Sequence, residues 1–136
     1  MANISYSIKN PEKSQKIVVK TASFTVKPGD SGKTFYLNST TAITATLPKV
    51  TAGNDGTTVT FVVGALAGAS DHRVTPATGD FIFHAPAGTA AATVSQSLVF
   101  ANASDHVGQH VTLVASKALV GWVPVASGTA ASLTKA

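Results

Sequence analysis

The 136-residue sequence contains no cysteine, a single arginine (Arg73) and a single glutamate (Glu12). Without cysteine there is no disulfide framework, and none is required, because a chain of this length can bury roughly two-thirds of its unfolded surface. No uninterrupted apolar run approaches the roughly 20 residues of a membrane helix, and the N-terminus lacks the apolar stretch of a secretory signal. These absences predict one soluble domain, made in a cytoplasm, with no membrane partner.

Charge is also scarce. Only 12% of the residues are charged and 44% are apolar, whereas about 25% are charged in typical globular domains. A monomer with so little charge would have a weakly solvated surface. Either Thr, Ser and Ala coat that surface, or protein neighbours cover much of it. Composition leaves both interpretations open.

The charge that is present is mostly lysine near the N-terminus, and the net charge is +4 with a pI of about 9.6. The lysines of this region are Lys9, Lys13, Lys16, Lys20, Lys27 and Lys33. Surfaces that bind nucleic acid usually combine arginine with aromatic platforms, and this sequence has no such interleaving. We therefore expect no nucleic-acid partner and interpret the lysine-rich start as a solvated arm that contacts an acidic protein surface.

The chain divides into three segments by the texture of its sequence. Residues 1–16 are polar, contain Pro11 and show no period, which predicts an extended N-terminal arm. Residues 17–125 alternate between β-branched or aromatic runs and turns rich in Gly, Pro, Asn and Asp, which predicts a β-domain. Residues 126–136 read as a small-residue C-terminal tail. The arm and the tail are candidates for contact with a partner.

Within the β-domain, turn signals recur about every 8–12 residues. The clearest strand is 58–63, and it follows the turn sequence GNDG at 53–56. In the segment 42–47, Ile43, Ala45 and Leu47 share one face and threonines the other. Later strands are predicted at 73–75, 81–83, 93–101, 110–115 and 120–125. About nine short strands and no sustained helical stripe predict an all-β fold: an antiparallel sandwich, a jelly-roll-like fold or a barrel.

The histidines offer the only pattern suggestive of a metal site. His72 follows Asp71 and His106 follows Asp105, so carboxylate and imidazole ligands would meet if the two loops were neighbours. Surface turns in which Asp caps the backbone are the simpler interpretation. His110 lies four residues after His106, but this segment reads as a turn and a strand rather than a helix. We therefore expect no bound metal.

No other constellation of residues predicts a reaction centre. The six carboxylates lie in the arm or in turns, and none forms a rigid pair. No serine stands in a nucleophile elbow. The sequence GDSGKT at 29–34 lacks the glycine spacing of a phosphate-binding loop. We expect no enzymatic activity and no cofactor.

The aromatic residues fall into two groups. Those within strand patterns are predicted to be core, namely Phe24, Phe35, Phe61, Phe81, Phe83, Phe100 and Trp122. Tyr6 instead lies in the arm. An aromatic side chain on such a segment either fills a partner's pocket or stays untethered, and both interpretations remain open.

Five motifs follow one another along the second part of the chain. They are DSGKTFYL (30–37), ITATLP (43–48), GTTVTFVVG (56–64), ASD (103–105) and GWV (121–123). Their order resembles a β-rich module of tailed-phage virion proteins, found in capsid decoration (cement) proteins and in fibre-like proteins. The resemblance spans about residues 30–129, and its motifs carry no catalytic residue. After the second Ser-Asp turn, where the module usually has a charged residue, this chain has His106-Val107-Gly108-Gln109-His110.

The resemblance implies a capsid decoration protein that binds the assembled head as a homotrimer and stabilises it. Its partner would be the major capsid protein, and it would lie on the capsid exterior of the virion. The arm would then carry the shell contacts, through Asn3, Ile4, Tyr6, Ile8, Lys9, Lys13, Lys16 and Lys20.

The alternative is a trimeric tail fibre, spike or receptor-binding domain that recognises a host surface glycan. A glycan site needs exposed aromatic side chains beside Asp or Asn at strand ends. The sequence offers Trp122 and Tyr36 for this role, and both are predicted to be buried. Small size and the absence of a long fibrous repeat favour decoration.

Overall fold

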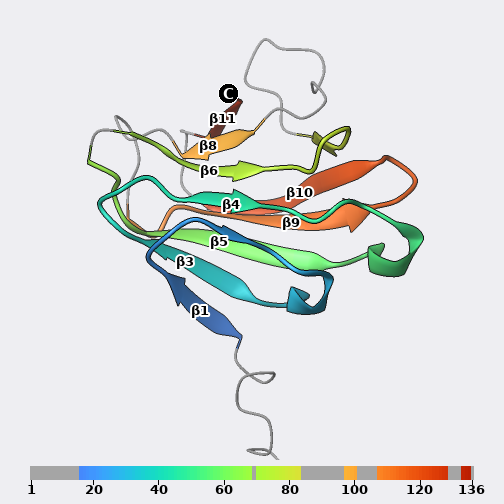
Figure 1. Cartoon of the computed structure of the whole chain (residues 1–136), viewed down its shortest axis with the longest axis horizontal. Coiled ribbons are helices and arrows are strands. Elements are labelled where there is room, and N and C mark those ends of the chain that lie inside the picture. The colour runs from blue at the N-terminus through green and yellow to red at the C-terminus, as the bar shows by residue number, and fades with distance from the viewer. Residues whose placement is uncertain (1–15, 69, 84–96, 101–106, 129–132, 136) are drawn as a thin grey trace, which may run out of the picture.

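The computed structural model describes residues 16–68, 70–83, 97–100, 107–128 and 133–135. They form two sheets that face each other across one core (Figure 1). The six-stranded sheet has the order β1 (Ile17–Lys20), β3 (Thr34–Asn38), β5 (Thr58–Ala65), β9 (His110–Ser116), β10 (Gly121–Gly128) and β7 (Phe81–Ile82). The five-stranded sheet has the order β11 (Leu133–Lys135), β8 (Leu98–Phe100), β6 (His72–Thr75), β4 (Thr44–Thr46) and β2 (Phe24–Thr25). Two short 3-10 turns, η2 (Pro28–Asp30) and η3 (Ala52–Asn54), lie at the ends of strands.

The first six strands alternate between the two sheets, and this winding decides how they pair. β1, β3 and β5 belong to the six-stranded sheet, and β2, β4 and β6 to the five-stranded sheet. Each crossing between sheets reverses the chain, so strands two apart in the sequence run in the same direction. β3 therefore pairs parallel with β1 and β5, and β4 pairs parallel with β2 and β6.

The prediction of an all-β fold is confirmed, and the two facing sheets make a sandwich. The expected antiparallel pairing needs correction, because the sheets are mixed. Among the described strands, five pairs are parallel and four are antiparallel. The antiparallel pairs include the hairpin of β9 and β10, in which the chain turns back within one sheet instead of crossing to the other.

Alternating burial along the strands places the core between the sheets. In β5, Val59, Phe61 and Val63 are buried while the residues between them are half-buried. The predicted faces of 42–47 are also confirmed, because Ile43, Ala45 and Leu47 are buried and the threonines point away. The fully buried large side chains include Trp122, Phe61, Phe100, Leu37, Ile43, Leu47, Ile82, Leu98 and Leu113.

Three of the predicted core aromatics lie at the margin of the core rather than inside it. Phe24, Phe81 and Phe83 are half-buried, whereas the other four are buried as predicted. Phe24 belongs to an edge strand, and its ring lies 5.0 Å from that of Phe35. The rings of Phe81 and Phe83 stack on each other at 5.3 Å beside the edge of the six-stranded sheet that β7 forms.

The C-terminal boundary also differs from the expectation. β10 continues to Gly128, so the predicted limit at residue 125 falls inside a strand. The predicted tail contains β11, which pairs antiparallel with β8. Of the predicted arm, only residue 16 lies within the described residues. In the described part of the chain, no helix has the length and apolar character needed to cross a membrane.

Candidate interaction surface

The six-stranded sheet turns one face to the core and the other, here called the outer face, away from it. Because successive side chains of a strand point to opposite sides, the buried residues identify the outer set. On β1, β3, β5 and β9 the outer face carries Ile17, Val19, Thr34, Tyr36, Asn38, Thr58, Thr60, Val62, His110, Thr112, Val114 and Ser116. None of these described side chains belongs to Lys, Arg, Asp or Glu.

The strand register arranges the outer face in rows. In one row, Thr34 pairs with Thr60 and Thr60 with Thr112. The hydroxyl groups of Thr60 and Thr112 lie 2.8 Å apart and hydrogen-bond to each other. Two of the three hydroxyl groups of this row thus bond to each other, and a protein neighbour can cover the row without stripping water from a charge.

An apolar row follows toward the end of β3 and β5. Val19 pairs with Tyr36, Tyr36 with Val62, and Val62 with His110. Val107, in the loop before β9, stands beside this row with 66% of its surface exposed. The row and this loop border a depression of about 530 Å³, here called the hollow, lined by Val19, Tyr36, Asn38, Val62, Val63, Gly64, Val107, Gly108 and His110.

The backbone holds the walls of the hollow in place. The N–H of Gly108 donates to the carbonyl of Val63 at 2.7 Å, and the N–H of Val63 donates to the carbonyl of Gln109 at 2.8 Å. Gly108 has a φ of +93°, a left-handed conformation that glycine adopts without strain. The loop is thereby fixed against β5, and the hollow is a preformed feature of the sheet.

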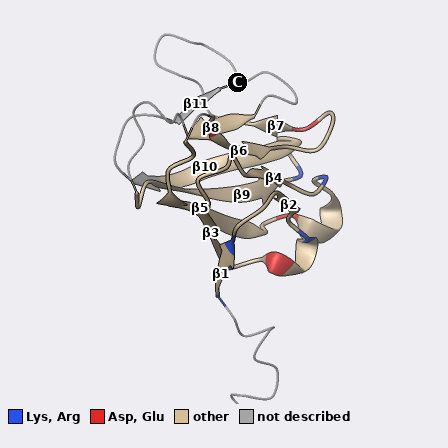
Figure 2. Cartoon of the chain, turned by 60° about the vertical axis from the view of Figure 1, so that its left-hand side comes forward, with Lys and Arg blue, Asp and Glu red and all other residues tan. Residues whose placement is uncertain are grey.

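Most charged residues lie away from the outer face of the six-stranded sheet. Figure 2 shows most of them at the end of the molecule that carries the 3-10 turns, while the sheet faces are largely uncharged. Lys33 pairs with Asp30 at 3.0 Å and Lys49 with Asp80 at 2.8 Å. This separation leaves one broad uncharged face and one charged end.

Asp30 forms part of this charged end. Burial raises the pKa of its carboxyl group, but the hydrogen bonds and positive charges around it together lower the pKa more. The backbone N–H of Lys27 donates to Oδ2 at 2.9 Å, and the Lys33 ammonium lies 3.0 Å from Oδ1. The net result is a pKa below the ordinary value of 3.8.

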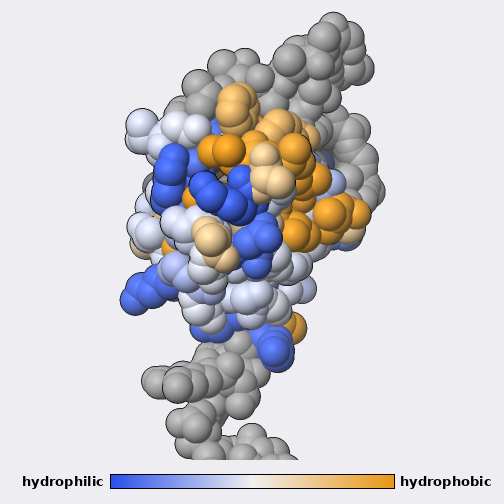
Figure 3. All heavy atoms as spheres, turned by 90° about the vertical axis from the view of Figure 1, so that its right-hand side faces the viewer, coloured by the Kyte–Doolittle hydropathy of each residue, from blue (hydrophilic) through white to orange (hydrophobic). Residues whose placement is uncertain are grey.

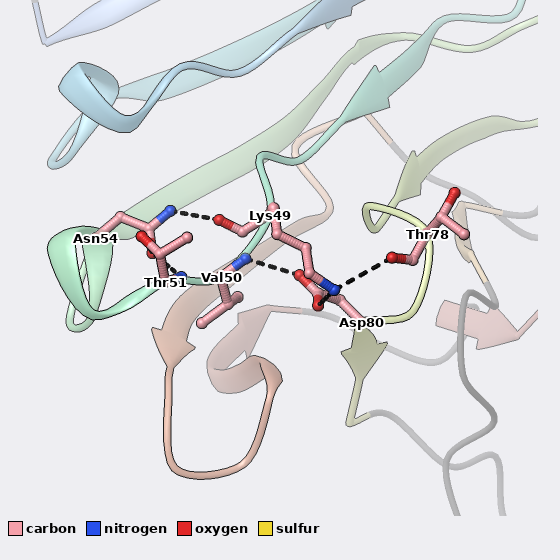
Figure 4. Close-up of polar contacts among 6 residues, drawn as sticks. All are labelled: Lys49, Val50, Thr51, Asn54, Thr78 and Asp80. Carbon is pink, nitrogen blue, oxygen red and sulfur yellow. Dashed lines mark hydrogen bonds and ion pairs between the residues drawn. The ribbon is translucent and has the colours of Figure 1, made fainter.

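A buried carboxylate ties two loops together behind the charged end. Asp80 has no exposed side-chain surface, and its Oδ2 accepts a hydrogen bond from the N–H of Val50 at 2.8 Å. Its Oδ1 accepts from Nζ of Lys49 at 2.8 Å, and the same Nζ donates to the carbonyl of Thr78 at 3.2 Å (Figure 4). Both carboxylate oxygens are therefore engaged in structural contacts.

Asn54 extends this network into η3. Its Nδ2 donates to the carbonyl of Lys49 at 2.7 Å, and its Oδ1 accepts from the N–H of Thr51 at 2.7 Å (Figure 4). Buried polar groups of this kind are favourable only when every member has partners, as here. The network thus explains why the turn sequence GNDG holds a fixed conformation before β5.

His72 is a core residue of β6 rather than a surface turn residue. Only 1% of its surface is exposed. Nδ1 accepts a hydrogen bond from the N–H of Ile43 at 3.0 Å, and Nε2 lies 2.8 Å from the carbonyl of Ala65, to which it donates. This pattern fixes the neutral Nε2–H tautomer and occupies both nitrogens. The interpretation of His72 as a surface turn residue is therefore wrong. The ring is buried and links the backbone at Ile43, just before β4, to the backbone at Ala65, the last residue of β5.

The remaining predicted ligands do not come together in the described residues. Asp105 and His106 lie outside them. His110 is half-buried at the hollow, where Nδ1 lies 3.3 Å from the carbonyl of Gly108. Within the described ranges, no group of three or more His, Asp or Glu side chains is placed to hold a metal ion.

Two of the predicted arm contacts fall within the described residues. Lys16 is exposed, and its carbonyl accepts a hydrogen bond from the N–H of Thr34 at 2.6 Å. Nζ of Lys20 lies 4.8 Å above the ring of Phe24, in a cation–π contact. The other predicted contacts lie outside the described residues, namely Asn3, Ile4, Tyr6, Ile8, Lys9 and Lys13.

The hollow itself was not predicted from the sequence. Tyr36 was expected to be buried, but it is half-buried and lines the hollow. The alternation of Val19, Tyr36 and Val62 with apolar neighbours along their strands is the signal that could have placed each on an outer face. Their meeting in one row depends on the parallel register, which the local pattern does not encode.

No protein-family model matches the chain, and a search of the curated proteins finds no match.

Proposed function

We propose that the chain is a structural protein of a larger assembly, namely a phage capsid decoration protein that binds the assembled head as a trimer and stabilises it. The observation that carries this proposal is the outer face of the six-stranded sheet. It offers Val, Ile, Tyr and Thr side chains across four adjacent strands with no charge among those described. The cores of protein interfaces are likewise depleted in charge.

The buried polar groups support a structural role over a catalytic one. His72 uses both ring nitrogens within the fold, and Asp80 uses both carboxylate oxygens. A general base or a metal ligand needs a free lone pair facing substrate or metal. These two groups, which are the most deeply buried titratable side chains described, instead hold loops in place.

The stabilising mechanism is mass action. A protein that binds the assembled shell and not its separated subunits shifts the equilibrium toward the shell. An interface of about 1,600 Å² is sufficient for specific binding. Repetition over many equivalent sites makes even modest contacts collectively strong.

The proposed shell contacts lie in the arm that precedes β1, with the major capsid protein as the partner. β1 is an edge strand, and Ile17 and Val19 on it are 54% and 57% exposed. β1, the first described strand, therefore borders the uncharged face. Lysines along the arm would meet acidic groups of the shell, and Tyr6 would act as an aromatic anchor.

Deleting residues 1–15 tests the assignment of the arm. The truncated protein should keep the circular dichroism spectrum and molar mass of the full chain, because both sheets lie beyond the deletion. It should no longer co-sediment with empty heads. Full decoration of heads by the truncated protein would contradict the assignment. A matched variant with residues 1–15 in scrambled order shows whether binding depends on the sequence of the arm or only on its length.

One observation favours the alternative of a fibre or receptor-binding domain. Tyr36, Asn38 and His110 meet at the hollow, which gives an aromatic ring beside amide and imidazole groups at a strand end. A sugar would fit such a site by stacking on the ring. Electron microscopy of virions labelled for this protein separates the two functions: label over the whole head supports decoration, and label at the tail tip supports a fibre.

A further inference from the structure

The turn that joins β9 to β10, residues 117–120 and here called the tip, exposes apolar side chains. Ala118 is exposed, Leu119 is 52% exposed and Val120 is 39% exposed. Figure 3 looks at the end of the molecule that carries this turn and shows hydrophobic residues gathered in one area beside hydrophilic ones. An apolar turn between two polar-faced strands is unusual, since tight turns are normally built from Gly, Asn, Asp and Ser.

The conformation of the tip is strained. Val120 has a φ of +56°, and it is the only described residue other than glycine with a positive φ. A β-branched side chain in this left-handed region is a genuine outlier, and such strain persists only where the surroundings over-determine it. Asparagine or glycine would relieve the strain, so the sequence keeps an apolar side chain at a conformational cost.

Hydrogen bonds hold the tip rigid from both sides. The N–H of Lys117 donates to Oδ1 of Asp55 at 2.7 Å, and the N–H of Leu119 donates to Oγ of Ser116 at 3.3 Å. The N–H of Val120 donates to the carbonyl of Lys117 at 3.2 Å. A rigid apolar projection loses little conformational entropy on binding, as binding hot spots require.

The hollow is the complementary feature of the same molecule. Its lining side chains are apolar or neutral, and its volume of about 530 Å³ lies in the range of pockets that enclose small organic ligands. The side chains of Leu119 and Val120 together are smaller than such ligands. The hollow has no charged lining residue, so Leu119 and Val120 can enter it without burying a charge, while the ammonium of Lys117, the one charged residue of the tip, has to stay in water.

The tip of one molecule cannot reach its own hollow. His110, at the start of β9, lines the hollow, while the tip follows the end of β9 at Ser116. A strand of this length separates the two features by roughly 20 Å at about 3.4 Å per residue. Projection and depression therefore lie at opposite ends of the six-stranded sheet.

We infer that the tip of one copy inserts into the hollow of the next copy, in a head-to-tail contact. A contact between two different patches of the same chain is heterologous, and it closes into a ring when the rotation per step is a whole fraction of a turn. Three copies joined in this way form a three-fold ring. The inference rests on the homotrimer of the proposed function and adds the interface by which it forms.

Two single variants in the full-length protein test the contact by molar mass from light scattering. Leu119→Asp charges the tip, and Val107→Asp charges the hollow. Both side chains are largely exposed, so the fold should tolerate either change. Each variant alone should be monomeric where the wild type is a trimer, with association weakened about 30-fold or more, as for a hot-spot residue. Val125→Asp, at another exposed apolar position, is the matched control and should keep the trimer.

Mixing the two variants gives the decisive result. The Leu119→Asp variant keeps an intact hollow, and the Val107→Asp variant keeps an intact tip, so one contact forms between them. The 1:1 mixture should therefore contain a complex of two chains and no trimer. A trimer that persists in both single variants would overturn the inference and leave the homotrimer intact. A wild type that stays monomeric at about 1 mM would overturn the inference and the homotrimer together, while head binding remains a separate measurement.

Cysteine cross-linking provides a second, independent measurement, because the chain has no native cysteine. The double variants Leu119→Cys/Val107→Cys and Leu119→Cys/Val19→Cys should each form covalent trimers under mild oxidation, reversible by dithiothreitol. Leu119→Cys/Val125→Cys is the matched control and should not. If neither hollow pair cross-links beyond the control, the tip is not the occupant of the hollow.

Discussion

At the scale of single residues, the fold depends on a few buried polar groups that are fully satisfied. His72 and Asp80 are 1% and 0% exposed, and each links segments about 30 residues apart in the sequence. An unsatisfied buried group costs far more than a satisfied one contributes. Because the sequence shows only their residue types, both were interpreted as turn residues, and their burial follows from tertiary packing alone.

The pair Lys49 and Asp80 should behave as one unit. Asp80→Ala leaves the N–H of Val50 without its partner, and Lys49→Ala leaves a fully buried carboxylate without its counter-ion. We expect each to lower the free energy of unfolding by about 1–3 kcal/mol. The double variant should lose less than the sum, with a coupling energy of about 1 kcal/mol or more in urea unfolding. Lys117→Ala, on an exposed lysine, is the control; simple additivity would contradict the account.

Asp30 should make part of the stability depend on pH. Its pKa in the folded protein is below the ordinary value of 3.8, so its contribution is complete above that value and is lost as the pH falls through the folded pKa. Asp30→Asn should therefore destabilise the protein at pH 7, by less than about 1 kcal/mol for a surface pair. Urea unfolding at a series of pH values should show the difference between wild type and variant shrinking as the pH falls below 3.8. A difference that stays constant over the acid range would argue against a shifted pKa of Asp30.

At the scale of elements, the sequence predicted strands well and their pairing poorly. Segments 58–63, 42–47 and 110–115 coincide with β5, β4 and β9 within a few residues, because alternation is a local property. The winding between two sheets was not visible. Ile17 pairs with Thr34 and Thr34 with Thr60. The number of residues between one strand of the six-stranded sheet and the next is therefore unequal, and the sequence shows no regular repeat. The hollow and the tip were missed for the same reason.

Gly121 controls how β7 docks on the sheet. A Cβ there would lie 2.6 Å from the carbonyl oxygen of Phe81 and 2.7 Å from the ring of Phe83. Gly121→Ala should therefore push β7 away and cost about 1–3 kcal/mol by overpacking. Urea unfolding measures the cost, and faster amide exchange at Phe83, which donates to the carbonyl of Trp122, reports the loss of docking.

Gly29→Ala is the matched control for that substitution. A Cβ at Gly29 meets no atom within 4 Å, so its effect should stay within about 0.5 kcal/mol. If Gly121→Ala were as neutral as Gly29→Ala, the close approach of β7 to β10 would not exist in solution.

At the scale of the whole molecule, the chain separates its surfaces by character. The charged residues gather at the end with the 3-10 turns (Figure 2), and the outer face of the six-stranded sheet is uncharged among its described residues. Low overall charge left two interpretations open, a coat of small polar residues or a covered surface. The structure shows a threonine row and an apolar row side by side. We propose that protein neighbours cover this face.

The central proposal is that the protein binds an assembled shell. Co-sedimentation of the protein with empty phage heads, and separately with unassembled capsid subunits, measures this directly. We expect saturable binding to the heads, in a fixed ratio of copies to capsid subunits, and no binding to the separated subunits. A folded protein that stays in the supernatant at every concentration of heads would contradict the proposal.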